Sequence, residues 1–386
     1  MPEAVIVDVV RTPVGRAFKG SLAPLRPDET LAHVIDRVLE RNPEVDPAQV
    51  EEVIAGCGQP QGLQANNIAR IAVLLSDTLG RETAGSTISR YCSSGLDAIR
   101  AAANNVHAGQ GDVYVAAGVE FVSSYNGAQE ATRPEDQHEH LKGGNGRPDA
   151  FIAMGITAEN VAERYGVTRE QQDEYAQRSQ ERAVAAQLSG FFDREIVPVS
   201  VNGTEVTRDD GPRASSTLEK LGTLAPAFRE GGSVTAGNSC PLNDGAAAAI
   251  VMSDTKAREL GLMPRARIVT AATWGNEPEY MGVAPIGAVR KALARAGMSI
   301  GDVDVYELNE AFAAQVIPIA AEVGFDYDKL NPHGGAIALG HPFGMTGVRI
   351  MATLLNDLET LDATVGLETM CVAGGQGEAM IVERLR

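Results

Sequence analysis

The segment Ser94-Gly95-Leu96-Asp97-Ala98-Ile99-Arg100 starts an expected helix, and the strand Val113-Tyr114-Val115-Ala116-Ala117 follows it. The segment Thr346-Gly347-Val348-Arg349-Ile350-Met351 starts a second helix with a similar opening, and this helix leads into a strand at residues 365–370. The copies lie about 252 positions apart, and similarity at a fixed spacing indicates a duplicated unit. We therefore predict an α/β chain of two related halves. Chance similarity between unrelated α/β segments is the alternative.

A second pair of segments extends the repeat. Asp46-Pro47-Ala48-Gln49-Val50-Glu51-Glu52-Val53-Ile54 has the pattern of a short helical turn and a strand that ends near Cys57. Ser299-Ile300-Gly301-Asp302-Val303-Asp304-Val305-Tyr306 has the same pattern and ends at Asn309. Two copies of one α/β unit are expected to pack sheet against sheet through helices.

A different kind of sequence lies between the halves. Residues 120–242 are rich in Gly, Gln, Glu, Arg and Asn, and residues 158–188 form one strong amphipathic stretch. A polar insertion carried on a scaffold is where substrate contacts are usually found. We therefore predict an inserted loop domain here.

Composition excludes several classes of protein. The chain has 386 residues, 44% of them hydrophobic, which suggests two or three core-forming units. The net charge of −18 comes from 51 acidic and 33 basic residues and opposes binding to a polyanion. We expect no nucleic-acid partner.

The cysteines, the apolar runs and the chain ends indicate the cellular compartment that we expect for the protein. The four cysteines are too few for a disulfide framework and lack zinc-ligand spacing, so we expect reduced thiols and no metal site. No apolar run approaches about 18 residues, and the N-terminus lacks the pattern of a signal peptide. The last residues, Glu383-Arg384-Leu385-Arg386, are not a peroxisomal address. We predict a cytoplasmic protein without a membrane span.

Two residues at expected helix starts are candidates for chemistry. Cys92 precedes the first repeated helix, where free N–H groups and the helix dipole are expected to lower the thiol pKa from about 8.5. A buried, inert cysteine is the alternative. His341 lies in a glycine-rich segment, residues 334–344, just before the second repeated helix, so we expect it to face the same cleft. His333 is ambiguous from sequence alone.

Two more candidates lie at ends of expected strands. Cys371 precedes Val372-Ala373-Gly374-Gly375, where a thiol and backbone donors would be exposed at the carboxyl end of a strand. Asn309 lies at a strand-to-helix junction, where it could instead be a helix N-cap.

Taken together in order, these segments resemble the thiolase family, the acyl-CoA C-acyltransferases. The resemblance runs from Arg11-Thr12-Pro13 to the C-terminus. The matching blocks are Cys92-Ser93-Ser94-Gly95-Leu96, Met154-Gly155-Ile156-Thr157-Ala158-Glu159-Asn160, Thr235-Ala236-Gly237-Asn238, Leu242-Asn243-Asp244-Gly245-Ala246-Ala247, Asn309-Glu310-Ala311-Phe312-Ala313, residues 334–344 and residues 371–377.

The resemblance implies a role for each candidate. Cys92 would be the acylated nucleophile, His341 would take its proton, and Cys371 would give a proton to the substrate α-carbon or remove one. Asn309, through a water, and His341 would form one oxyanion hole. The backbone N–H groups of Cys92 and Ala373 would form the other.

The resemblance also implies the fold and the coenzyme A contacts. The fold would have five layers, αβαβα, with residues 1–119 plus 243–263 as the N-terminal half, 264–386 as the C-terminal half, and 120–242 as the inserted domain that holds CoA. Met154 and Met281 match pocket-lining positions, with ordinary core packing as the alternative. Arg213 matches a position near the nucleotide, and Lys220 is a further candidate, although either could be a solvated surface charge.

This sequence departs from the family pattern at several positions. Cys240-Pro241 stands where Ser-Gly is common beside the pantetheine, so the hydrogen-bonding groups at this position differ from those of the family. Tyr91 and Ala373 also differ from common choices, although Ala373 keeps its N–H. Residues 142–147 lie in a variable part and indicate no particular substrate.

The resemblance predicts cleavage of 3-ketoacyl-CoA by CoA, or the reverse Claisen condensation, with acyl-CoA and CoA as the partners and no metal or redox cofactor. A ketoacyl synthase is the nearest alternative, but that family has a His where Cys371 stands. A non-catalytic acyl-CoA-binding subunit is another, which the retention of all four candidates disfavours. We expect a homotetramer, with a dimer as the alternative, and a second contact through the polar residues 123–147.

Overall fold

The computed structural model describes residues 2–125, 134–144 and 146–386. Ten strands of this part of the chain form one large sheet, and two more form a separate hairpin. The strands are β1 (Ala4–Arg11), β2 (Gly15–Arg16), β3 (Glu52–Cys57), β4 (Ala84–Ile88), β5 (Val113–Phe121), β6 (Val199–Val201), β7 (Thr204–Val206), β8 (Asn243–Ser253), β9 (Ala266–Gly275), β10 (Val305–Leu308), β11 (Val365–Val372) and β12 (Gln376–Arg384).

The large sheet consists of two halves joined along a short seam. Its order is β10-β11-β12-β9-β1-β8-β5-β3-β4, with β2 paired to β8. Within each half the strands next to the repeated helix are parallel, β3 with β4 and β5, and β10 with β11. The halves meet where β1 and β9 pair, at Val5 with Arg267 and Ile6 with Ala266. Because the contact is this short, the two half-sheets can diverge and face one another.

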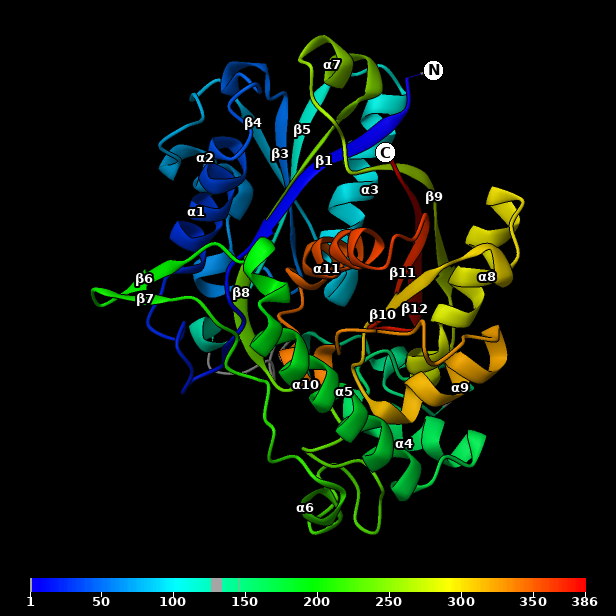
Figure 1. Ribbon diagram of the computed structural model, residues 1–386. Coiled ribbons are helices and arrows are strands. Elements are labelled where there is room, and N and C mark those ends of the chain that lie inside the picture. Colours follow the sequence, from blue (N-terminus) through cyan, green and yellow to red (C-terminus); the bar gives the residue numbers. More distant parts are fainter. Residues whose placement is uncertain (1, 126–133, 145) are drawn as a thin grey trace.

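The helices form the other three layers of a five-layer α/β fold (Figure 1). They are α1 (Pro27–Glu40), α2 (Ile68–Leu75), α3 (Ser94–His107), α4 (Met154–Tyr165), α5 (Arg169–Ser189), α6 (Leu218–Gly222), α7 (Asp254–Glu259), α8 (Pro285–Ala296), α9 (Ala313–Val323), α10 (Ala336–Leu339) and α11 (Thr346–Thr360). One apolar core packs α1 and α2 on the first half-sheet, and a second packs α8 and α9 on the other. The middle core holds α3 and α11 between the half-sheets.

Alternation along the strands produces these separate cores. In β5, Val115 and Ala117 belong to the outer core of the first half, whereas Tyr114 and Ala116 belong to the middle core. The β12 strand alternates in the same way between the middle core and the outer core of the second half. Strands buried on both faces are almost continuously apolar, as the sequence shows.

The predicted duplication is confirmed by equivalent elements in the two halves. Matching positions lie 252 residues apart: Val53 in β3 and Val305 in β10, Ser94 and Thr346 at the starts of α3 and α11, and Val113 and Val365 at the starts of β5 and β11. The two helices touch through their glycines. A Cβ on Gly347 would lie 2.2 Å from Leu96 N, and one on Gly95 would lie 2.6 Å from Gly344 O.

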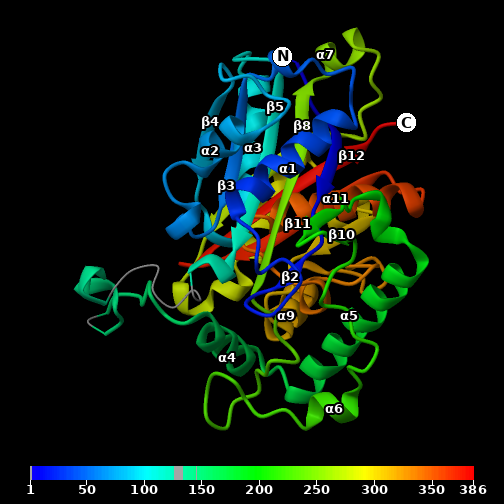
Figure 2. The ribbon, with the colours of Figure 1, turned by 90° about the vertical axis from the view of Figure 1, so that its left-hand side faces the viewer.

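The inserted segment forms the lower part of the molecule, around α4, α5 and α6 (Figure 2). The single amphipathic stretch expected at residues 158–188 is divided into two helices, which corrects that prediction. Gly166 ends α4 with a left-handed φ of 66°, and Thr168 then caps α5 in a capping box with Gln171. The chain direction therefore changes between them.

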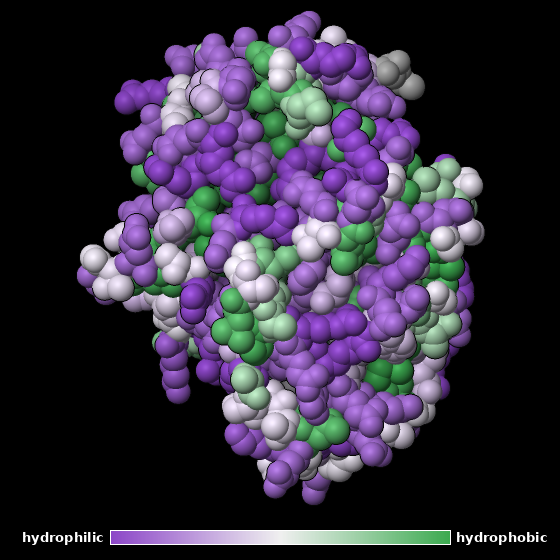
Figure 3. All heavy atoms as spheres, viewed as in Figure 1, coloured by the Kyte–Doolittle hydropathy of each residue, from purple (hydrophilic) through white to green (hydrophobic). Residues whose placement is uncertain are grey.

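Two general findings concern the surface and the helices. The face seen in Figure 3 is mostly hydrophilic, with separate hydrophobic patches. Across residues 2–125, 134–144 and 146–386, no helix combines the length and the apolar composition that crossing a membrane requires.

Candidate active site

The four candidate residues come from both halves and lie at element ends. Cys92 lies in a 3₁₀ turn, Tyr91–Ser93, between β4 and α3, and His341 lies between α10 and α11. Asn309 follows β10, and Cys371 lies near the end of β11. Contacts described below link Cys92 with Cys371 and Asn309 with His341, and the backbone of Asn309 is bonded to β11, the strand of Cys371.

The Cys92 turn is strained and tightly packed. Tyr91 has a left-handed φ of 43°, which is uncommon for a residue other than glycine. Beneath it, a Cβ on Gly58 would lie 3.1 Å from Tyr91 O and 2.6 Å from Glu120 Oε2, so only glycine fits there. The tight packing around the turn maintains the left-handed backbone of Tyr91. Strained backbone of this kind is common at functional sites.

The predicted low pKa of the Cys92 thiol is wrong for the resting protein. Burial among protein atoms raises the pKa well above its ordinary value, and the nearby thiols Cys371 and Cys240 add to this. The backbone N–H of Ala373 donates to the sulfur and acts in the opposite direction, but it does not offset the burial. The resting group is therefore a thiol, and a base must remove its proton.

His341 is held as a neutral ring in one tautomer by its hydrogen bonds. The Thr346 hydroxyl lies 2.7 Å from Pro342 O, which can only accept, so Thr346 donates its one proton there. The same hydroxyl lies 2.7 Å from His341 Nδ1, so it accepts from Nδ1–H. His341 Nε2 then carries no proton, and Asn309 Nδ2 donates to it at 3.3 Å. Burial and Arg349 lower the His341 pKa to about 3, which keeps the ring neutral.

Asn309 is a buried residue with unused hydrogen-bonding capacity. Its Oδ1 has no partner among the described residues. The alternative that Asn309 caps the next helix is wrong, because α9 begins at Ala313 with Phe312 as its N-cap. Asn309 N donates to Thr369 O at 3.0 Å, so its backbone is held to β11.

Glu310, next to Asn309, anchors this segment. Its carboxylate accepts from Tyr175 Oη at 2.8 Å, Ser179 Oγ at 2.6 Å, Asn331 Nδ2 at 2.8 Å and Ile337 N at 3.1 Å. These partners come from α5 and from the segment before His341. The inserted domain is thereby fixed to the second half beside the site.

Cys371 is buried and hydrogen-bonded. Gln315 Nε2 donates to its sulfur at 3.0 Å, and burial raises its pKa to about 11. Burial likewise raises the pKa of Cys240 to about 12, with Cys371 adding to the shift. None of the four cysteines forms a disulfide in the described residues.

The segment after Cys371 is a tight hairpin. Val372 pairs with Gln376, so residues 373–375 form the turn between β11 and β12. Gly374 and Gly375 have φ of 77° and 80°, a conformation that favours glycine. Ala373 precedes them and directs its N–H at Cys92.

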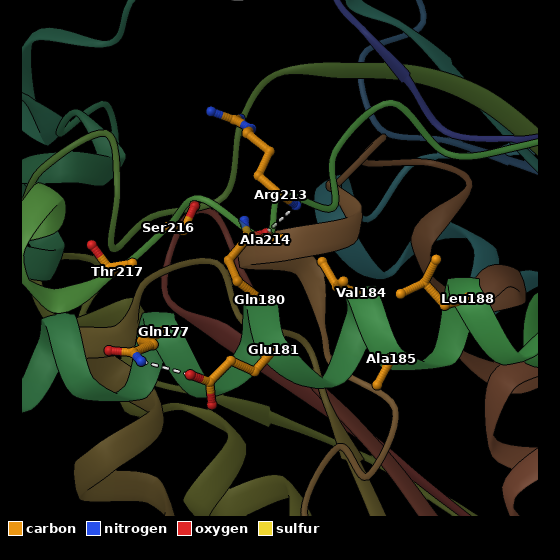
Figure 4. A pocket seen from close by; sticks show the side chains of 10 residues that line it. All are labelled: Gln177, Gln180, Glu181, Val184, Ala185, Leu188, Arg213, Ala214, Ser216 and Thr217. Carbon is orange, nitrogen blue, oxygen red and sulfur yellow. Dashed lines mark hydrogen bonds between the residues drawn. The ribbon is translucent and has the colours of Figure 1, made fainter.

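The expected CoA contacts occupy two places. Met281 and Cys371 belong to one buried apolar cluster, and Met154 and Cys240 pack against it, partly buried. Arg213 lies elsewhere, at a surface pocket of about 260 Å³ between α5 and residues 213–217 (Figure 4). Its backbone N is bonded to Gln180 Oε1 at 2.7 Å, and Figure 4 shows its side chain extending away from α5.

None of the four candidate catalytic residues lines the Arg213 pocket. The Arg213 pKa is lowered by burial and by the neighbouring Arg16. Two guanidinium groups near one another favour an anion between or beside them.

His333, ambiguous in the sequence, has a packing role. Its Nδ1 lies 2.5 Å from Asp357 Oδ1, and its ring stacks on Phe191 with centroids 3.6 Å apart. Across the described ranges, no group of three or more His, Cys, Asp or Glu side chains is arranged to hold a metal ion.

Sequence reasoning missed several residues that shape the site. Glu120 accepts from Gly58 N at 2.8 Å and Gly344 N at 2.9 Å and so ties the Cys92 side of the site to the His341 loop. Thr346 and Gln315 orient His341 and Cys371. Thr346 lies in the repeated helix opening and Glu120 at a strand end, but neither position reveals its partner.

Comparisons with known proteins agree with this architecture. Models of the thiolase N-terminal and C-terminal domains match residues 4–255 and 262–384. The chain is 43% identical over 403 residues to the 3-oxoadipyl-CoA/3-oxo-5,6-dehydrosuberyl-CoA thiolase of Escherichia coli. It is 45% identical over 395 residues to the 3-ketoacyl-CoA thiolase of Shewanella frigidimarina. Each alignment covers both proteins completely.

Solved structures show the same fold. The acetyl-CoA acetyltransferase of Bacillus anthracis superimposes with a TM-score of 0.91 at 41% identity, covering 100% of this chain and 99% of that one. The dimeric peroxisomal thiolase of Saccharomyces cerevisiae gives 0.92 at 36% identity, covering 99% and 97%. The resemblance inferred from the motifs is therefore confirmed.

Proposed function

The chain belongs to the thiolase family and is an acyltransferase, and we propose that it cleaves 3-ketoacyl-CoA with CoA, or runs the reverse condensation, through an acyl-Cys92 intermediate. The observation that carries this proposal is the pair of linked turns at the site. The Ala373 N–H of the second half meets the Cys92 sulfur of the first half, and His341 presents an unprotonated Nε2.

The proposed cleavage begins with proton transfer. His341 Nε2 takes the Cys92 proton as the sulfur attacks the 3-keto carbon, and the N–H groups of Cys92 and Ala373 stabilise the developing oxyanion. The bond between the α-carbon and the former keto carbon breaks, and Cys371 donates its proton to the α-carbon. This step releases acetyl-CoA and leaves an acyl thioester on Cys92.

The second half-reaction transfers the acyl group to CoA. The Cys371 thiolate takes the proton of the CoA thiol, whose sulfur attacks the thioester carbonyl. The N–H groups of Cys92 and Ala373 again stabilise this oxyanion, whereas Asn309, through a water, and His341 would stabilise the thioester oxygen of the departing acetyl-CoA in the first half-reaction. Cys92 leaves as a thiolate and regains its proton from the His341 imidazolium, so no proton is gained or lost over the cycle.

CoA is proposed to lie between the inserted domain and the site. Met154 and Met281 would contact the acyl and pantetheine groups, Cys240 would lie beside the pantetheine, and Arg213 would approach the nucleotide. The apolar cluster beside Cys371 supports the first assignment. The exposed position of Arg213, near Arg16, supports the last.

The test measures CoA-dependent cleavage across a panel of 3-ketoacyl-CoA substrates. The loss of substrate absorbance reports the rate of cleavage. The panel includes short-chain, long-chain, dicarboxylic and steroid-derived acyl groups, because relatives with different names are similarly related to this chain. Cleavage of at least one substrate with release of acetyl-CoA is expected. Absence of cleavage and of the reverse reaction across the panel would contradict the proposal.

The assembly is proposed to be a homotetramer, with a dimer as the alternative. The half-exposed strand β4 ends the large sheet, and Leu74 and Leu75 of neighbouring α2 are exposed, so an apolar surface borders an open strand edge. Residues 126–133 and 145 of the expected second contact lie outside the described residues. Light scattering that gave a monomer at micromolar concentration would contradict both states.

We further propose a cytoplasmic protein that needs no metal or redox cofactor. Four free thiols support a reducing compartment. The proposed chemistry uses only thiols, an imidazole and amide donors. Unchanged turnover after treatment with a chelator is the expected result.

A further inference from the structure

A cluster of four charged side chains and one amide joins the Cys92 turn to the hairpin after Cys371. Arg90 Nε donates to Asp97 Oδ2 at 2.9 Å, and Arg90 Nη1 donates to Gln376 Oε1 at 3.0 Å. Arg100 Nε donates to Asp97 Oδ1 at 2.7 Å and lies 3.0 Å from Glu378 Oε1. We call these five residues, Arg90, Asp97, Arg100, Gln376 and Glu378, the inter-half clamp.

The clamp is well shielded from solvent. The Glu378 side chain is fully buried, and that of Asp97 is 6% exposed. The arginines are 27% and 29% exposed. Removing one partner of such a pair leaves a charge without compensation, and the Arg100–Glu378 pair is the one that connects α3 of the first half with β12 of the second.

The clamp acts beside the reacting groups on both sides. Arg90 is two residues before Cys92, with strained Tyr91 between them. Gln376 is three residues after Ala373, across the two glycines with positive φ. The bond between Arg90 and Gln376 therefore connects the turn that carries the nucleophile with the hairpin that carries the Ala373 N–H.

We propose that the inter-half clamp sets the position of the Cys92 sulfur relative to the Ala373 N–H, so that its members are positioning residues for acylation. The inference rests on the proposed function. The Cys92 turn belongs to the first half and the turn at residues 373–375 to the second. Their relative position therefore depends on non-covalent contacts such as the bond between Arg90 and Gln376. A misplacement of about 1 Å is enough to slow a reaction by orders of magnitude.

Glu378 makes the clamp sensitive to pH. Burial, with Asp97 adding to it, raises the Glu378 pKa to about 7, while Arg100, the Ser93 hydroxyl and Arg90 act in the opposite direction. Glu368 faces it from β11 as a further carboxyl group. Above pH 7 the carboxylate is ionised and pairs with Arg100, and below pH 7 it is neutral. Acylation should therefore rise as the pH increases through about 7.

The experiment measures the rate of Cys92 acylation by acetyl-CoA between pH 6 and 9, by stopped-flow detection of released CoA. The variants are Glu378→Gln, which keeps the neutral form at every pH, and Gln376→Leu, which removes the bond to Arg90. The control is Glu383→Gln, at the other end of β12, where Glu383 pairs with Arg267 at 2.6 Å. Melting temperatures show whether each variant folds.

We expect Glu378→Gln to acylate about tenfold more slowly at pH 8 and to lose the rise near pH 7, while the control keeps both. Gln376→Leu should slow acylation about tenfold and leave the KM for CoA unchanged. If Glu378→Gln does not fold, the result for Gln376→Leu alone tests the inference. Wild-type rates in a folded Glu378→Gln enzyme at every pH, or in Gln376→Leu, would overturn the inference. A wild-type enzyme without acylation would instead contradict the proposed function.

Discussion

The turns before α3 and α11 occupy equivalent places in the two halves but differ in exposure. The Cys92 turn is half-buried, and its neighbour Tyr91 is 43% exposed. His341 is 1% exposed and hydrogen-bonded at both ring nitrogens. Under the proposed function, the less buried Cys92 turn would receive the acyl group, whereas the more buried His341 segment would hold the base in one tautomer. The duplication therefore produced two equivalent turns, before α3 and before α11, and these turns differ in how deeply they are buried.

The neighbouring helices show the same contrast. Every residue of α11 from Thr346 to Leu358 is buried, whereas α3 keeps an exposed side that includes Asn104. The charge of Arg349 in α11 is therefore placed in the interior, where it disfavours a proton on His341. The α3 arginine, Arg100, remains partly exposed and pairs across to β12.

The largest expected effect comes from removing the nucleophile of the Cys92 turn. Cys92→Ser should form no acyl adduct and lose at least about 10³-fold in turnover, because a hydroxyl has a far higher pKa than a thiol. Intact-protein mass spectrometry after mixing with acetyl-CoA, followed by peptide mapping, measures the adduct. An acyl group on Cys371 in the wild type would reverse the assignment.

The second cysteine should have a different, smaller effect. Cys371→Ser should still be acylated on Cys92, yet cleavage and condensation should slow about 10²-fold, because a proton must move at the α-carbon. Single-turnover acylation and steady-state cleavage separate the two steps. Full turnover in this variant would remove Cys371 from the mechanism.

Removing a hydrogen bond that orients His341 should have an intermediate effect on the turnover rate. Thr346→Val keeps the shape but removes the hydroxyl that accepts from His341 Nδ1, so the neutral ring can adopt the wrong tautomer. We expect kcat to fall about 10- to 100-fold, with little change in the KM for CoA. Thr353→Val, one of the buried threonines in the same helix, is the control. Equal losses in both variants would indicate a structural role only.

The smallest effect is expected outside both turns. Arg213→Ala should raise the KM for CoA several-fold and lower kcat less, as the loss of uniform binding does. Arg258→Ala, exposed on α7, is the control. An unchanged KM for CoA would remove Arg213 from the CoA site.

The sequence alone predicted the duplicated α/β chain and the residues at its element ends. Periodicity and spacing are local properties, so Cys92, Asn309, His341 and Cys371 could be found from motifs and position. The division at Gly166 was missed, although a glycine followed by a capping Thr168 is itself a local signal.

Tertiary structure decided the properties that depend on distant partners. The direction of the Cys92 pKa shift follows from burial by both halves, which outweighs the effect expected from the helix start alone. The His341 tautomer follows from the direction of one hydroxyl, and the inter-half clamp joins residues 286 positions apart. Desolvation and hydrogen bonding act over a few ångströms in space, so these properties could not be read from the order of residues.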